Sequence, residues 1–396
     1  MNREKGKKRA GRALLLLCAG LLFTLGFESA GYQTAVVPIS QQFRFGAAGI
    51  GRIVSVQYFS MMLFSFLLGR LADRVGKKTV MILAMLLFML GCGVTLIPGT
   101  LGLLSFGIFL AGGGFGAVEG LSNAVLVDHD AARADRALNV TQFAFSIGAF
   151  VSPIVCSAAM ERGADWRVPF LLCAAAGIPL FAALLRLPFP RAQEVTAPAP
   201  AAQSGGQGGT RWLLPLVVSI FFYVGNEIGI SYFNGVFFTE VLRRPDCGAA
   251  ALSLFWLSMG VSRLIFGFVR VDAERVIRVC QLVMAISLAL LACTRDVLTA
   301  LALTAVLGAA AGPVWPLLVS AAVRSCPGAS GTMSGVMTLS SGFGGAVVPL
   351  LFGALSERVS LGASYLTLSA FSLLGFALMA LRARKTRGKP VCLRKR

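Results

Sequence analysis

The chain has 396 residues, of which 56% are hydrophobic and 13% are charged, and its mean hydropathy is +0.78. A soluble domain carries about 25% charged residues, so this composition excludes a soluble globular protein and indicates a membrane protein. The formal net charge of +19 would suggest a nucleic-acid partner in a soluble chain, but the positions of the basic residues argue against one.

Basic residues gather at the two chain ends and in alternate gaps between apolar runs. The chain begins MNREKGKKRAGR and ends RARKTRGKPVCLRKR. Such clusters orient helices on the anionic inner leaflet, which predicts cytoplasmic termini and an even number of spans. We therefore expect a multi-pass protein of the cell (inner) membrane, surrounded by lipid and without a nucleic-acid partner.

Cysteine and histidine usage disfavours metal or redox chemistry. The nine Cys residues are scattered, mostly within apolar runs, and form no C-x-x-C pair, and the single histidine, His129, falls in a polar gap. This pattern predicts neither a disulfide framework nor a metal site.

Apolar runs long enough to cross a bilayer recur along the whole chain. A hydrocarbon core of about 30 Å needs roughly 20 residues per helix, and the first run lacks the small-residue cleavage site of a signal peptide. We predict an all-α membrane protein with twelve transmembrane helices, at 13–37, 49–69, 79–98, 101–127, 137–159, 168–187, 212–239, 249–270, 276–294, 297–322, 330–356 and 363–382.

Residues 188–211 are rich in Pro, Ala, Gly and Gln and show no periodicity, which is typical of a flexible linker. We expect this cytoplasmic linker to join a six-helix half, 1–187, to a second six-helix half with a basic tail, 212–396. The halves echo each other at one common offset, which pairs Gly112 with Gly308, Gly116 with Gly312, Gly148 with Gly344 and Pro153 with Pro349. Duplicated halves are typical of transporters, although small residues at such spacing also recur in other membrane bundles.

The gap between the second and third spans carries a specific motif. Residues 69–78 read GRLADRVGKK, a pattern of Gly69, Asp73, Arg74, Gly76, Lys77 and Lys78. Gly76 suits the positive φ of a tight turn, Gly69 suits close packing at the end of a span, and the two lysines suit the inner membrane surface. Taken alone, the string also fits a basic loop with an incidental acid.

This string resembles, position for position, the loop signature of the major facilitator superfamily. The resemblance covers essentially the whole chain and implies twelve helices that alternate access to a central site. It also implies that Asp73 and Arg74 take part in a gating interaction between the halves.

Four charged residues fall inside predicted spans. Glu28, Glu119, Glu227 and Arg263 lie in the first, fourth, seventh and eighth spans. A carboxylate at mid-bilayer costs about 2.5–3.5 kcal/mol, so such groups normally face a cavity or a partner. Glu28 and Glu227 are related by nearly the repeat offset, which predicts that both reach a shared centre. A structural clamp of Glu119 with Arg263 is the alternative.

Polar and aromatic groups share helical faces with these charges. Asn123 lies one turn from Glu119, Tyr223 and Ser231 flank Glu227, with Asn234 two turns on, and Trp256 lies two turns from Arg263. Trp315 occupies the position equivalent to Glu119 in the second half. A polyol needs such carboxylates, amides and aromatic rings, and a buried Glu can carry a proton.

A second resemblance narrows the expected function. GGGFGAVEGLSNAVLVD, RALNVTQFAFSIGAFVSPI and YVGNEIGISYF look like the fucose/glucose/galactose:proton symporter branch of the superfamily. The resemblance implies that Glu119, Asn123, Tyr223 and Glu227 bind sugar or proton, and it points at Glu28.

We therefore expect a proton symporter of a small polar solute, a sugar first, that acts as a monomer and needs no cofactor beyond the proton gradient. The alternative is a proton-coupled multidrug or metabolite exporter of the same fold, although the fourth span has no basic residue and no Gly pair follows Pro153. A membrane enzyme is disfavoured because nucleophiles, His and acids do not cluster. A solute sensor that binds without transport is a further alternative.

Overall fold

The structure is a computed structural model that describes residues 2–97, 99–129, 134–187, 189, 213–269, 272–325 and 330–386. These residues form helices joined by short turns, with no strand among them. Twelve stretches are long and apolar enough to cross a membrane, which confirms the predicted number of spans and the all-α class. The expected linker 188–211 lies outside the described residues apart from Phe189, so the division of the chain there stays a prediction.

The helices follow the predicted order with somewhat different ends. They are α1 Asn2–Phe43, α2 Ala47–Val75, α3 Lys77–Thr95, α4 Leu101–His129, α5 Ala134–Glu161, α6 Val168–Arg186, α7 Leu214–Val236, α8 Gly248–Phe268, α9 Ala273–Cys293, α10 Val297–Ala311, α11 Val314–Ser325, α12 Ser330–Arg358 and α13 Leu361–Thr386. A π-helical turn, Phe237–Val241, extends α7. The tenth span predicted at 297–322 is present as Val297–Ser325, and its helix is interrupted between α10 and α11.

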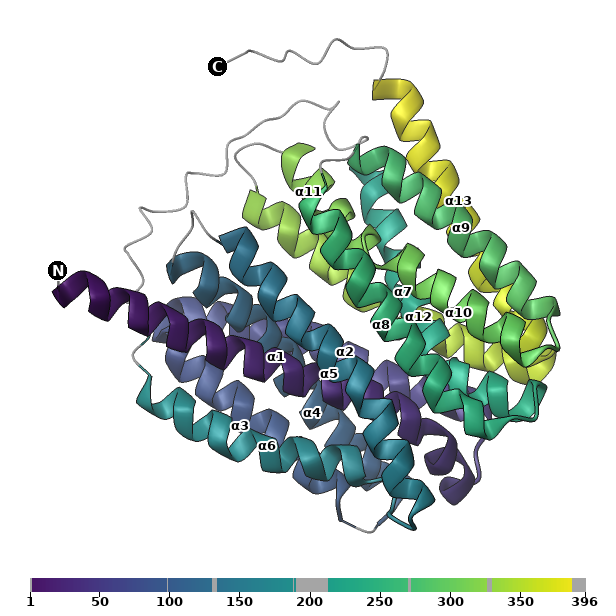
Figure 1. Ribbon diagram of the computed structural model, residues 1–396, viewed down its shortest axis with the longest axis horizontal. Helices are drawn as coiled ribbons and strands as arrows, with labels where there is room; N and C mark the ends of the chain where they lie inside the picture. Colours follow the sequence, from purple (N-terminus) through teal and green to yellow (C-terminus); the bar gives the residue numbers. More distant parts are fainter. Residues whose placement is uncertain are drawn as a thin grey trace.

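Helices α1–α6 form one group and α7–α13 another, and the two groups lie side by side in Figure 1. Because the number of spans is even, α1 begins and α13 ends on the same side of the bundle, which we name the terminal side. The opposite side is the far side. The groups meet through α2 with α12 and α5 with α8, and more weakly through α1 with α7.

The two groups are joined near the far side. Hydrogen bonds cross from Ala48 N to Glu357 at 2.9 Å, from Ser55 Oγ to the Ala346 carbonyl at 2.5 Å and from Ser253 Oγ to the Phe150 carbonyl at 3.0 Å. Two further hydrogen bonds between the groups join side chains, from Tyr232 to Gln57 and from Trp256 to Gln33. Within the described residues every hydrogen bond between the groups lies in the far half of the bundle, and the groups diverge toward the terminal side (Figure 1). The structure is therefore closed at the far side.

The internal repeat has a counterpart in helix packing. Gly148 on α5 packs against the backbone carbonyl of Phe23 on α1, and Gly344 on α12 packs in the same way against the carbonyl of Phe221 on α7. A Cβ at either glycine would overlap that carbonyl oxygen. The equivalent glycines predicted from the sequence thus permit equivalent close approaches between the first and fifth spans of each group.

Replacing Gly148 or Gly344 by Ala is expected to lower stability by about 1–3 kcal/mol, because a methyl group placed on a packed backbone forces the helices apart. The matched control is Gly120→Ala on α4, where an added Cβ meets nothing within 4 Å. Thermal unfolding in detergent, followed by size-exclusion chromatography, measures the difference. Equal midpoints for Gly148→Ala and Gly120→Ala would show that the contact has no structural importance.

Candidate solute and proton site

The intramembrane ion pair joins α7 and α8. The Glu227 side chain lies with one carboxylate oxygen 4.0 Å from an Arg263 guanidinium nitrogen, and the two side chains are 11% and 19% exposed. Arg263 Nε also donates to the Gly312 carbonyl at 3.3 Å. Both contacts are long for charged partners, so part of the guanidinium's hydrogen-bonding capacity stays available to a further anion or hydroxyl.

The break between α10 and α11 explains where Arg263 binds. Proline has no N–H, so Pro313 leaves the carbonyl of Ala309 without a helical partner, and Pro316 does the same for Gly312. Ser262 Oγ donates to the Ala309 carbonyl at 2.6 Å, next to the Arg263 bond to Gly312. Two successive residues of α8 therefore satisfy the two carbonyls that the prolines free.

Tyr223 completes this side of the site. Its hydroxyl donates to the carbonyl of Ala311, the last residue of α10, at 2.9 Å, and it lies within electrostatic range of Glu227 and Arg263. The broken span thus presents backbone carbonyls to side chains of α7 and α8. Discontinuous membrane helices commonly form such sites because their unwound backbone can bind ions and polar solutes.

Glu119 faces this pair from the other group. It lies on α4 beside Gln142 of α5, and Arg263 and Glu227 act on it through longer-range electrostatics. Within the described residues it forms no ion pair at 4 Å, so a direct clamp of Glu119 with Arg263 is absent. Asn123, one turn along α4, has a buried carbonyl oxygen without a hydrogen-bond partner.

Glu28 has its own hydrogen-bond partner on α2. It is 1% exposed, and its hydrogen-bond donor is Gln57 of α2, whose Nε2 lies 3.2 Å from each carboxylate oxygen. Tyr58, on the same helix, interacts electrostatically with Glu28, Glu119 and Glu227. All three acids therefore lie within electrostatic range of one tyrosine, Tyr58.

The remaining predicted site residues, Trp256, Asn234 and Trp315, have separate surroundings. Trp256 Nε1 donates to Gln33 of α1 at 3.0 Å, and its ring meets Phe145 edge-on at 5.9 Å. Asn234 is buried, and its Nδ2 has no partner in the described part of the chain. Trp315 is partly buried against the core on α11, so its contacts are those of packing.

The gating-loop residues lie on the terminal side. Gly76 has the positive φ, 95°, that the turn between α2 and α3 requires. Lys77 pairs with Asp128, and Lys78 donates to the carbonyls of Leu185 and Leu187 at 2.9 Å each, so both lysines tie α3 to neighbouring helices.

The other loop residues make fewer contacts than expected. The predicted close packing at Gly69 is wrong, because an added Cβ there would meet nothing within 4 Å. Asp73 and Arg74 are exposed and form no ion pair with any described residue. No ion pair therefore joins these two side chains to the second helix group within the described residues, on the side where the groups diverge.

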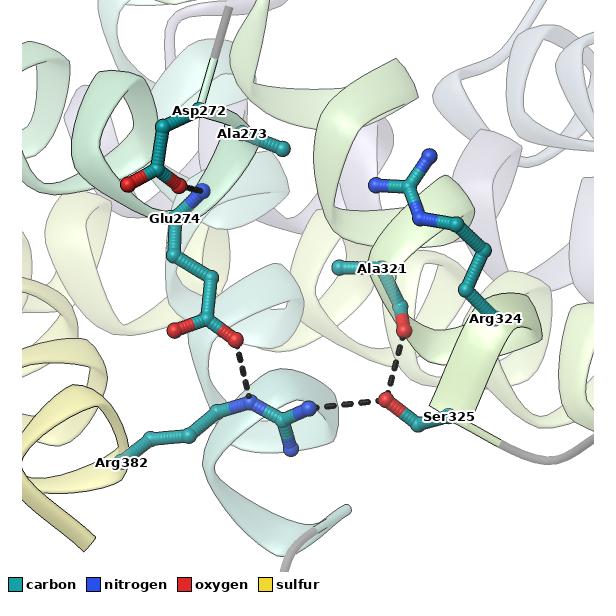
Figure 2. A pocket seen from close by; sticks show the side chains of 7 residues that line it. All are labelled: Asp272, Ala273, Glu274, Ala321, Arg324, Ser325 and Arg382. Atoms are coloured by element: carbon teal, nitrogen blue, oxygen red, sulfur yellow. Dashed lines mark hydrogen bonds and ion pairs between the residues drawn. The ribbon is translucent and has the colours of Figure 1, made fainter. Parts of the chain in front are cut away.

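The equivalent turn in the second group carries a pocket of about 300 Å³ on the terminal side. Figure 2 shows that Asp272 caps the start of α9, while Arg382 of α13 bonds Glu274 at 3.1 Å and Ser325 of α11 at 2.7 Å. This cluster ties three helix ends together and lies apart from the intramembrane charges.

Sequence reasoning missed the uncharged partners of the predicted acids. Gln57 and Gln142 are amides inside apolar runs, and a search for every amide in a span would have found them. Ser262 had no signal of its own, since a serine is common in membrane helices. Pro313 and Pro316 after Gly312 could have predicted the break in the tenth span.

Comparison with known proteins identifies the class. The model of the Major Facilitator Superfamily matches residues 16–245 and 216–395. This chain therefore belongs to the major facilitator superfamily, a family of membrane transporters. The chain is also 29% identical over 185 residues, 44% of its length, to a gentisate transporter of Corynebacterium glutamicum, and the match spans 40% of that protein.

Solved structures share the fold. A peptide transporter POT has a TM-score of 0.79 at 14% identity, covering 96% of this chain and 99% of that one. The nucleoside transporter NupG has 0.77 at 17%, covering 93% and 99%. The fucose:proton symporter FucP of E. coli has 0.65 at 16%, covering 93% and 98%. The likeness extends to transporters of unlike solutes, so it gives the sugar branch no preference.

Glu227→Gln alone is expected to destabilise the protein by ~2 kcal/mol, because it leaves the Arg263 charge uncompensated within the membrane. Combining it with Arg263→Gln is expected to restore much of the loss, since no charge then remains. Thermal midpoints of both single variants and the double variant test this coupling. Additive losses in the double variant would mean that the two side chains do not interact.

Proposed function

We propose that this protein is a secondary active transporter that moves a small polar solute together with a proton by alternating access. The observation that carries the proposal is the pair Glu227–Arg263 on one helix group, with Glu119 facing it from the other. A solute bound between them would contact both groups, so its binding would depend on how the groups are arranged. Charges held inside a membrane at such a cost are typical of substrate and proton pathways.

We assign the proton to Glu119. It is the carboxylate of this cluster that has no cation within ion-pair distance among the described residues, and its neighbour Gln142 is uncharged. A carboxylate in that position can accept a proton without leaving an unpaired basic group behind. Glu227, in contrast, compensates Arg263, and protonating it would uncover that charge.

The orientation of the protein in its membrane is proposed from the distribution of basic residues in the sequence. We place both termini in the cytoplasm of a cell with an inner membrane, because the basic residues concentrate on the terminal side. The far side then faces outward, and this structure represents the state open to the cytoplasm. The protein acts as a monomer and uses the proton gradient in place of a cofactor.

A sugar remains the first proposed solute class. Hydroxyl groups could bind Glu119, Gln142 and the available edge of Arg263, and the apolar face of a sugar ring could stack on an aromatic side chain. The unpartnered amide oxygen of Asn123 offers one more acceptor.

An aryl carboxylate such as a hydroxybenzoate is the second candidate. Arg263 is a guanidinium with hydrogen-bonding capacity to spare, which suits a carboxylate, and the edge-on pair Trp256–Phe145 lies on the helices that border it. The gentisate transporter of C. glutamicum, which shares 29% identity over part of the chain, supports testing this class.

Uptake coupled to protons is measured as alkalinisation of a weakly buffered cell suspension when a solute is added. We expect a signal with one member of a panel of hexoses, pentoses and hydroxybenzoates, and its loss in Glu119→Gln. The matched control is Glu161→Gln, which makes the same change at an exposed carboxylate on the far side. Silence across the panel, together with lower accumulation of a fluorescent hydrophobic cation, would favour the exporter instead.

Arg263→Gln separates the two solute classes. If the solute is an aryl carboxylate, loss of the charge-assisted bond is expected to weaken binding by about ten- to a hundred-fold, whereas a neutral sugar loses roughly ten-fold or less. The KM for uptake measures this effect. An unchanged KM with either class would remove Arg263 from the binding site.

A further inference from the structure

Gln57 joins the two helix groups at the centre of the far half. Its Nε2 lies 3.2 Å from both oxygens of Glu28 on α1, and its Oε1 accepts a hydrogen bond from the Tyr232 hydroxyl of α7 at 2.5 Å. All three side chains are buried. One amide therefore connects a carboxylate of the first group to a tyrosine of the second.

Glu28 has no cation to balance it among the described residues. The titratable groups that interact with it are Tyr32 on α1, Tyr58 on α2, Cys92 on α3, Cys173 on α6 and Tyr232 on α7, and all of these are uncharged. The other helices packed on α1, which are α4, α5 and α8, add no titratable group that acts on Glu28. The Gln57 amide is thus the donor that stabilises the ionised carboxylate.

The two ends of an amide group have opposite roles. Nitrogen donates and oxygen accepts, so an ionised Glu28 fixes the nitrogen toward itself and directs the oxygen toward Tyr232. When Glu28 binds a proton, its hydrogen bond with the amide loses the assistance of charge and weakens. The amide is then less restrained, and the bond to Tyr232 weakens with it.

We propose that Gln57 is a positioning residue that couples the charge of Glu28 to closure of the far side. The ionised carboxylate holds Gln57 against Tyr232 and keeps the groups together, and protonation releases them. This inference rests on the alternating access of the proposed function, and it concerns protonation of Glu28, apart from the transported proton assigned to Glu119.

A neighbouring pair provides a matched control. Gln33 on α1 donates to Ser29 at 3.3 Å and accepts from Trp256 of α8 at 3.0 Å. The geometry is the same, a glutamine that accepts a bond from an aromatic donor of the second group, but its own acceptor is a hydroxyl. Breaking this bond should loosen the closure without changing its response to pH.

The test measures how readily a cysteine between the groups reacts. Val37 on α1 lies beside Gly235 of α7, between Gln57 and the far side of the bundle. In Val37→Cys protein in lipid nanodiscs, modification by a maleimide is followed by mass spectrometry from pH 5 to 8. Rates are divided by those of Ala164→Cys, an exposed residue in the far turn between α5 and α6, which removes the reagent's own pH dependence.

We expect the relative rate to rise as pH falls. Gln57→Leu, Glu28→Gln and Tyr232→Phe should each raise the rate at pH 8 about five-fold and abolish its pH dependence. Gln33→Leu should raise it but leave the pH dependence intact. Tyr232→Phe removes only one hydroxyl group, so it still tests the proposal if Gln57→Leu or Glu28→Gln does not fold.

A wild-type pH profile in both Gln57→Leu and Tyr232→Phe would overturn the proposal. Loss of pH dependence in Gln33→Leu as well would also overturn it, because the response would then reflect general loosening. No solute is added, so the result is independent of whether the proposed solute classes are transported.

Discussion

Backbone carbonyls that lack partners inside a membrane are the constraint on which the arrangement of the site depends. Hydrocarbon offers no hydrogen bonds, so each carbonyl freed by Pro313 or Pro316 must find a side-chain donor. Ser262 and Arg263 supply those donors from α8. Arg263 then needs a counter-charge, and Glu227 provides it from α7. The position of the ion pair therefore follows from two prolines on another helix.

The two helix groups share the same glycine-to-backbone packing, but the chain continues differently after the glycines. Gly112 and Gly116 of α4 pack on the carbonyls of Gln57 and Met61, and the equivalent Gly308 and Gly312 pack on those of Phe255 and Met259. In the first group the helix continues without a break and carries Glu119 one turn later. In the second group Pro313 follows the glycine and the helix breaks. The repeat thus preserves packing while the chemistry diverges.

The far side is where the groups depend on each other. Backbone acceptors there, such as the carbonyls of Ala346 and Phe150, receive bonds that do not vary with pH, whereas the bond from Tyr232 ends on an amide that also contacts a carboxylate. On the terminal side Asp73 and Arg74 are exposed and form no ion pair with any described residue. In the alternating access proposed above, a change of state would exchange polar contacts at one end of the bundle for contacts at the other.

The amino-acid sequence by itself determined the number of spans, their order, the repeat and the identity of the charged residues within the membrane. These features depend on local composition and periodicity, because a bilayer requires some twenty apolar residues per helix and tolerates few charges. Only the tertiary structure decided which groups meet. Glu28 binds Gln57, and Arg263 binds the carbonyl of Gly312 at the end of α10, because helix rotation and close approach depend on packing between distant segments.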